Sequence, residues 1–202
     1  MDSEGAITDL IEDLSDMDDD VREAAKKELV AIGAPAIPQL IEALAENLWD
    51  ISDQAADILA EIGAAAVPAL MEELGIVERY HALCISDTLG RIGAPAISAL
   101  SEALQDLDEQ LREYAIRAFS NMGAPAIDAI PVLIEALGDP EEEVRTYSAY
   151  ALANLEGAAK DAVPALIAAL EDDSERVQHH VAYALEKIDT PEAKQALIAL
   201  TT

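Results

Sequence analysis

The residues best suited to chemistry in this sequence are three histidines and one cysteine. His179 and His180 are adjacent, in a segment whose apolar spacing predicts a helix. Adjacent residues on a helix point about 100° apart, so these two imidazoles are poorly placed to close on one ion. We therefore predict no metal site and no cofactor.

Cys84 is the second candidate, since a thiolate beside a base is a nucleophile. His81 and Asp87 lie within one helical turn of Cys84 on the expected helix, which makes a Cys–His pair conceivable. Such catalysis also needs an orienting group and an oxyanion pocket, and the sequence carries no recognisable motif for either. The glycines are isolated and periodic, so no phosphate-binding loop is expected. We predict no catalytic residue and no enzymatic activity.

Three acid-rich segments, 13–20, 138–143 and 171–175, invite comparison with calcium loops. They lack the ligand spacing and the central glycine of a helix-loop-helix calcium site. Asp, Glu and Ser just before a helix accept hydrogen bonds from its free N–H groups and suit its positive end. We predict helix capping at these segments.

Composition and charge exclude several classes of protein. The chain has 202 residues, with 12 basic and 41 acidic side chains and a net charge of -29. Nucleic-acid binding requires a basic footprint, so neither DNA nor RNA is an expected partner. A hydrophobic share of 51%, rich in Ala, Leu and Ile, predicts a folded chain built from helices. One cysteine, an acidic amino terminus and no long apolar run indicate a soluble, cytoplasmic protein that does not enter a membrane.

The sequence is built from repeats. IGAPAIPQLIEAL at 32–44 recurs with small changes at 62–74 and 92–104, and longer versions follow. Upstream of each copy, apolar residues recur at offsets 0, 4, 8 and 11, which is one face of a helix. Each repeat is therefore a helical hairpin, closed by a glycine where a left-handed residue is needed. The expected repeats are about 6–33, 34–63, 64–93, 94–123, 124–156 and 157–189, followed by a terminal helix at 190–202.

Such a hairpin cannot bury its apolar face alone, so neighbours must stack into an elongated right-handed superhelix. Units such as DDDVREAAKKELVAIGAPAIPQLIEAL resemble HEAT-like repeats, in particular the short kind shared with phycobilin lyase subunits. The resemblance covers nearly the whole chain and implies a single all-α domain over 1–202, an α-solenoid of about six hairpins plus the terminal helix. Arginine follows the first apolar residue of the second helix at Arg22, Arg112 and Arg145, but Ser52, Ala82 and Gln178 replace it elsewhere. Any Asp–Arg ladder between repeats is therefore expected to be interrupted.

In this architecture the second helices line the concave surface, and the rows beside their apolar stripe are the candidate binding face. All five tyrosines fall on these rows, and tyrosine is enriched at interfaces. We predict partner binding by Tyr80, Tyr114, Arg117, Asn121, Tyr147, Tyr150, Asn154, His179, His180 and Tyr183. Acidic residues line the same rows in the earlier repeats, at Asp50, Asp53, Asp57, Glu61 and Asp87.

These patterns favour a non-enzymatic scaffold or adaptor that binds a protein or peptide segment. The segment is expected to be basic, because an acidic groove steers positive charge toward it. Two alternatives stay open: a chaperone-like or phycobilin-lyase-like subunit, and a purely structural or engineered repeat scaffold. A source living at high salt would also account for the charge of -29. Leu197, Ile198 and Leu200 have no repeat after them, so contact with a second molecule, or oligomerisation, through the last helix is a further expectation.

Overall fold

A computed structural model describes residues 3–45 and 49–200. Within these residues the chain forms thirteen α-helices and no strand, which confirms the predicted all-α solenoid class. The chain packs as two compact units, Met1–Ala96 (unit 1) and Ile97–Thr202 (unit 2). The single domain expected over 1–202 stays a prediction.

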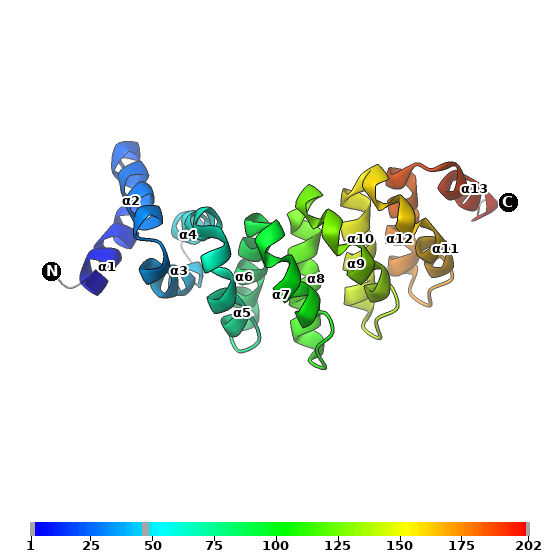
Figure 1. Cartoon of the computed structure of the whole chain (residues 1–202), viewed down its shortest axis with the longest axis horizontal. Coiled ribbons are helices and arrows are strands. Elements are labelled where there is room, and N and C mark those ends of the chain that lie inside the picture. Colours follow the sequence, from blue (N-terminus) through cyan, green and yellow to red (C-terminus); the bar gives the residue numbers. More distant parts are fainter. Residues whose placement is uncertain (1–2, 46–48, 201–202) are drawn as a thin grey trace. The chain divides into compact units, whose positions relative to one another are not determined.

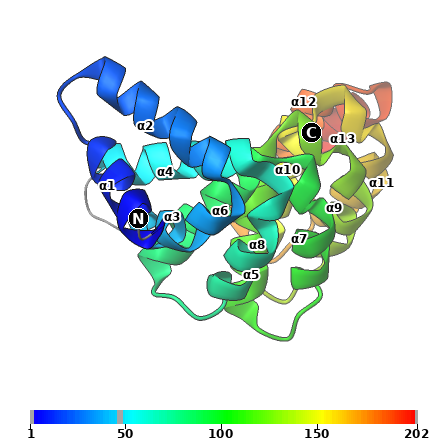
Figure 2. The same ribbon diagram turned by 60° about the vertical axis from the view of Figure 1, so that its left-hand side comes forward.

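Unit 1 is a stack of helical hairpins. Its helices are α1 (Ser3–Asp13), α2 (Asp19–Ile32), α3 (Ile37–Leu44), α4 (Trp49–Ile62), α5 (Val67–Leu74) and α6 (Arg79–Ile92), with 3-10 turns η1 (Ala34–Ala36), η2 (Gly63–Ala65) and η3 (Ala94–Ala96). The second helices α2, α4 and α6 pack against one another in one layer, and α1, α3 and α5 form the other (Figures 1 and 2).

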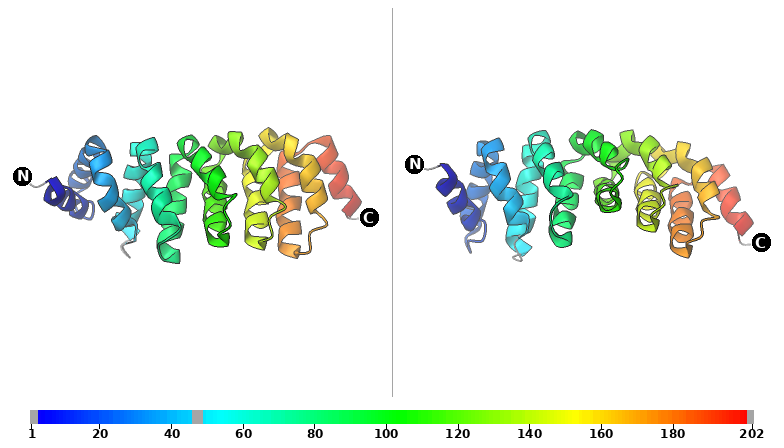
Figure 3. Two further views of the ribbon diagram at one scale, coloured as in Figure 1. Left: turned by 60° about the horizontal axis from the view of Figure 1, so that its bottom comes forward. Right: turned by 90° about the horizontal axis from the view of Figure 1, so that it is seen from below.

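Unit 2 repeats this arrangement. Its helices are α7 (Ile97–Ala103), α8 (Glu109–Met122), α9 (Ile130–Ala136), α10 (Glu142–Asn154), α11 (Val163–Ala169), α12 (Glu175–Ile188) and α13 (Pro191–Leu200), with 3-10 segments η4 (Ala124–Ala129) and η5 (Glu156–Ala162). Helix α10 packs between α8 and α12, so the second helices again lie side by side (Figure 3). The longer η4 and η5 account for the extra residues of the last repeats.

The predicted core stripe is confirmed at offsets 4 and 8 in both units, whereas several residues at offsets 0 and 11 are only half-buried: Val21, Ile32, Ile62, His81 and Leu111. Side chains at offsets 4 and 8 are buried in all six second helices, from Ala25 and Leu29 in α2 to Val181 and Leu185 in α12. Apart from Ser148 and Phe119, the side chains at these two offsets are aliphatic, so the hairpins stack closely. Phe119 is 1% exposed.

Glycine ends several second helices as expected. Gly33 follows α2 with φ of 67° and Gly123 follows α8 with φ of 65°, a region that L side chains rarely adopt. This turn lets the chain reverse its direction within a few residues and begin the first helix of the next hairpin.

Two of the three acid-rich segments cap helices, as predicted. Asp18 accepts a hydrogen bond from the N–H of Asp20 at the start of α2, and Ser174 accepts one from Val177 at the start of α12. In segment 138–143 the prediction is wrong, because Glu141 makes no side-chain cap; there Asp139 accepts the N–H of Glu141, at 2.8 Å, and shapes the turn before α10. The carboxylates therefore satisfy free N–H groups of their own chain.

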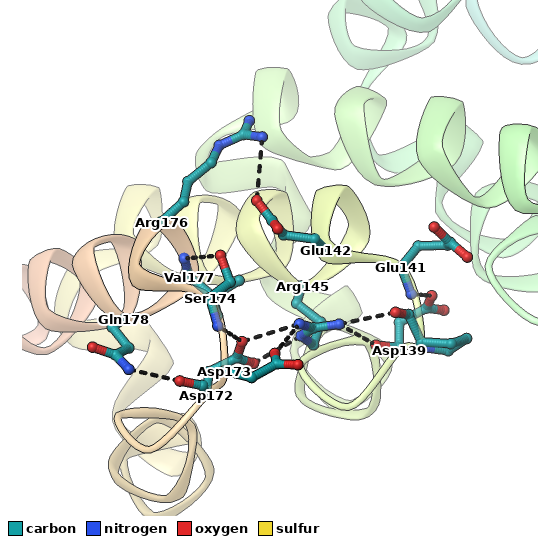
Figure 4. Close-up of polar contacts among 11 residues, drawn as sticks. Asp139, Glu141, Glu142, Arg145, Asp172, Asp173, Ser174, Arg176, Val177 and Gln178 are labelled. Carbon is teal, nitrogen blue, oxygen red and sulfur yellow. Dashed lines mark hydrogen bonds and ion pairs between the residues drawn. The ribbon is translucent and has the colours of Figure 1, made fainter.

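Two arginines, Arg112 and Arg145, link consecutive hairpins of unit 2, and Figure 4 shows the contacts of Arg145. Arg145 donates to the carbonyl oxygen of Asp139 in its own hairpin and to both carboxylate oxygens of Asp172 in the next, at 2.7 and 3.0 Å. Arg112 makes the same bidentate contact with Asp139, at 2.9 and 3.2 Å. Gln178 donates only to the carbonyl oxygen of Asp172, which is the interruption that its type predicts.

Among the described helices, no single one is long and apolar enough to cross a bilayer. One pair of helical segments, Ile51–Ala65 and Val67–Leu74, is long and apolar enough when the two are taken together, but it is bent by 114°.

Candidate protein-binding faces

The second helices of unit 2 present an exposed aromatic cluster, here called the aromatic face: Tyr147, Tyr150, His179, His180 and Tyr183. Tyr150 and Tyr183 are each 37% exposed, which is high for large rings. The rings of Tyr150 and His180 meet edge to face, with centroids 6.4 Å apart, and so join α10 to α12. This cluster combines apolar area with hydroxyl and imidazole groups at its surface.

Cations frame the aromatic face. The guanidinium of Arg117 lies 4.4 Å from the ring centroid of Tyr147, and the ammonium of Lys187 lies 5.4 Å from that of Tyr183. Arg176 pairs with Glu143 on α10, at 2.6 Å. These contacts hold the rings in place before any partner arrives, which lowers the entropy cost of binding.

One predicted contact residue is corrected here. Tyr114 is only 4% exposed, so its ring belongs to the core of unit 2 and offers no surface to a partner. It shares the register of Tyr147, but the neighbouring elements cover it. The two predicted asparagines, Asn121 on α8 and Asn154 on α10, are both exposed, and Asn154 donates its amide to the carbonyl oxygen of Ser120, at 2.9 Å.

In unit 1 the second helices enclose a pocket of about 210 Å³. Leu44, Ala56 and Leu83 supply apolar wall, and Tyr80 and Cys84 stand on the α6 side. The hydroxyl of Tyr80 lies beside Cys84, and repulsion by negative charge on this sulfur, together with a hydrogen bond between the two side chains, raises the pKa of Tyr80. Tyr80 is 46% exposed, so the pocket reaches the surface beside it.

The predicted acidic residues of unit 1 gather around two cations. Arg91 contacts Asp53 at 2.6 Å, Asp57 at 2.8 Å and Asp87 at 2.9 Å. Lys26 contacts Asp57 at 3.6 Å and Glu61 at 3.3 Å. These six groups carry two more negative than positive charges, so the α4–α6 surface stays acidic although it is internally paired. The side chain of the fifth predicted acid, Asp50, lies outside the described residues.

The pocket between α4 and α6 was not predicted from the sequence. The sequence feature that could have indicated it is Leu83. This apolar residue stands in a row where the other repeats have polar residues: Glu23, Asp53, Glu113, Thr146 and His179. The pairing of Arg91 was not predicted either, because two of its three carboxylate partners, Asp53 and Asp57, come from another helix.

The three histidines, the candidates for catalysis or metal binding, lie in two places in the structure. His81 directs Nε2 to the carbonyl oxygen of Ile41, at 2.8 Å, so it serves the packing between hairpins as expected of a core histidine. His179 and His180 have ring centroids 5.7 Å apart with planes at 84°. Within the described residues, no three His, Cys, Asp or Glu side chains cluster as a metal site would require.

The charge of the chain predicts a salt-dependent stability. Raising NaCl from about 10 to about 150 mM shortens the Debye length from about 30 to about 8 Å, which screens repulsion among 41 acidic groups. We expect the Tm to rise over this interval in a thermal melt followed by circular dichroism. Sorbitol at equal osmolality is the control, and a flat or falling Tm would contradict the prediction.

Comparison with known proteins agrees with this fold. HEAT repeats match residues 77–153 and 130–202. None of the curated proteins matches the chain in sequence. The solved complex of CpcE and CpcF of phycocyanin lyase from Nostoc sp. PCC7120 is 21% identical with a TM-score of 0.57, over 74% of this chain and 98% of that one.

Two further solved structures have the same fold. A designed armadillo repeat protein in complex with the peptide (KR)4 is 19% identical with a TM-score of 0.52, over 91% of this chain and 99% of that one. A mutant of Kap121p is 15% identical with a TM-score of 0.62, over 96% of this chain and 27% of that one. The chain also spans 61% of the length of an engineered protein to which it is 24% identical, with a TM-score of 0.49.

Proposed function

Because this chain belongs to the HEAT-repeat family, we propose that it is a non-enzymatic binding module whose second helices hold a segment of another protein. Repeat solenoids generally use extended surfaces of this kind for binding. The observation that carries the proposal is the aromatic face, in which Tyr147, Tyr150, His180 and Tyr183 are accessible and braced by cations. Tyrosines so placed are typical hot-spot residues.

The proposed segment is basic. Support comes from the two excess negative charges on the α4–α6 surface and from the net charge of -29. Because the carboxylates outnumber the cations that they share, this surface attracts further positive charge. The negative field of the protein also raises the rate at which a basic segment associates at low salt. The proposed compartment is the cytoplasm, which agrees with a single cysteine.

Removing the three accessible tyrosines tests the proposal. If each ring contributes about 1 kcal/mol or more, the variant Tyr147→Ala/Tyr150→Ala/Tyr183→Ala should bind its partner at least about a hundredfold more weakly. The measurement is a pull-down from source lysate, wild type beside variant, with mass spectrometry of what is retained and titration of the purified partner.

Two control variants separate lost contacts from lost structure. Ile127→Ala removes an apolar side chain that is 49% exposed on η4 and is not part of the aromatic face, and it should keep the partner. Tyr147→Phe/Tyr150→Phe/Tyr183→Phe keeps the ring area and should lose little affinity. If wild type and the alanine variant retain the same proteins, the aromatic face is structural and the purely structural alternative gains.

The likeness to the CpcE–CpcF complex supports a second candidate, a phycobilin-lyase-like or chaperone-like subunit. A bilin absorbs visible light and its spectrum changes when a protein holds it, so the spectral change during titration with phycocyanobilin separates the two functions. Saturable binding would favour the second candidate.

We also propose contact with a second molecule, or oligomerisation, through α13. It is supported by Ile198 and Leu200, which are 65% and 56% exposed, and analytical ultracentrifugation measures it.

A further inference from the structure

The pocket between α4 and α6 has the chemistry of an anchor site. Its walls are the side chains of Leu44, Ala56 and Leu83, and its α6 side carries Tyr80 and Cys84. Ala56 is buried in the wall, while Leu83 and Cys84 are partly exposed into it. A volume of about 210 Å³ accommodates one aliphatic side chain. Burying such a group in a preformed pocket is how a few interface residues provide most of the binding energy.

The rim of the pocket is charged. Asp53, Asp87 and Arg91 belong to both the pocket and the paired cluster that includes Asp57. Arg91 is bound by carboxylates from two helices, so its guanidinium is held at the rim rather than inside the pocket. The acidic groups outnumber it there, so the rim favours a cation next to the anchored side chain.

We propose that this pocket receives an aliphatic side chain, leucine in size, from a bound peptide segment whose flanking residues are lysine or arginine. The apolar walls hold the aliphatic side chain, and the carboxylates of Asp53 and Asp87 face the flanking cations. The inference rests on the proposed function, because it names which basic segments the α4–α6 surface selects.

The test uses two synthetic peptides of equal charge, KRKLRKR and KRKSRKR, each with a fluorescent label. The first should bind at least about tenfold more tightly in fluorescence anisotropy, because only leucine fills the pocket. Cys84 is the single cysteine of the chain and lines the pocket, so its alkylation by N-ethylmaleimide reports occupancy. KRKLRKR should slow this alkylation in proportion to its saturation, and KRKSRKR should slow it much less.

Two variants at the same position test the pocket: one fills it with a larger side chain, and the other leaves it open. Cys84→Phe places a ring in the space and should abolish the preference for KRKLRKR, whereas Cys84→Ala should keep it. Thermal melts of both variants verify that the fold is intact.

The outcomes are distinguishable. Equal binding of the two peptides with unchanged alkylation overturns the pocket inference and leaves the basic-segment proposal standing. No binding of either peptide at low salt overturns the basic-segment proposal and the inference with it. A preference that survives Cys84→Phe also overturns the inference, because the leucine would then lie elsewhere.

Discussion

Replacing Asp172 with alanine is expected to lower the stability of α10 and α12 by about 3 kcal/mol. The carboxylate of Asp172 is 9% exposed and receives two hydrogen bonds from Arg145, whose side chain is 12% exposed. It also accepts the N–H of Ser174, at 2.9 Å. Without it the guanidinium is left buried with fewer partners, which costs more than losing an exposed ion pair.

The neighbouring Asp173 is the matched control. It also contacts Arg145, at 3.0 Å, but its side chain is 92% exposed. An exposed pair contributes about 0–1 kcal/mol, so Asp173→Ala should change stability little. Because stacked repeats need not unfold as one unit, the measurement is native-state hydrogen exchange of amides in α10 and α12. Protection should fall by about a hundredfold in Asp172→Ala only.

The pH dependence gives a second readout of the same contact. The hydrogen bonds from Arg145 lower the pKa of Asp172, so the folded state holds this carboxylate ionised to lower pH than the unfolded chain does. Its contribution is complete above the ordinary Asp pKa of about 3.9 and is lost as pH falls through the lowered value. The difference between wild type and Asp172→Ala should therefore be constant above about pH 5 and shrink below about pH 4. A difference that is the same at pH 3 would show that the effect is not ionic.

Helix positions and the core were predictable because they depend on local order. The 3.6-residue period selects Leu29, Leu89 and Leu152 as core residues, and all three are fully buried. Caps were predictable for the same reason, since Asp18 and Ser174 act within three residues of their own position.

Tyr114 shows where this reasoning stops. It occupies the same row as Tyr147, yet Tyr114 is buried and Tyr147 is partly exposed. The helical period determines in which direction a side chain points from the axis of its own helix. Burial also depends on the elements that cover that direction, which come from other hairpins and are not encoded in the period.

The pairing of charges was equally hidden. Sequence rows place Asp53, Asp57 and Asp87 on the expected binding face, but Arg91 reaches the first two across 38 and 34 residues of chain. Asp87 lies one turn from Arg91 on α6, whereas only the stacking of α4 on α6 brings Asp53 and Asp57 within 3 Å of it. The acidic rows could therefore be predicted, and the pairing between helices could not.

The position of Phe119 leads to the last prediction. It is the single phenylalanine of the chain, 1% exposed, in a row that holds leucine in every other repeat, including Leu89 and Leu152. Phe119→Ala should destabilise unit 2 by about 3–5 kcal/mol, since the neighbours close only partly on the space of a lost ring. Phe119→Leu restores the side chain of the other repeats and should cost about 1 kcal/mol.

Urea unfolding of both variants, followed by circular dichroism, measures the difference. A much larger drop of the midpoint for Phe119→Ala than for Phe119→Leu means that this position requires a bulky side chain but not the ring itself. Equal losses in both variants would instead mean that α8 and its neighbours are shaped around the ring. The surroundings of Phe119 would then differ from those of the leucines in the other repeats, and the close equivalence of repeats that underlies the predicted core would fail at this position.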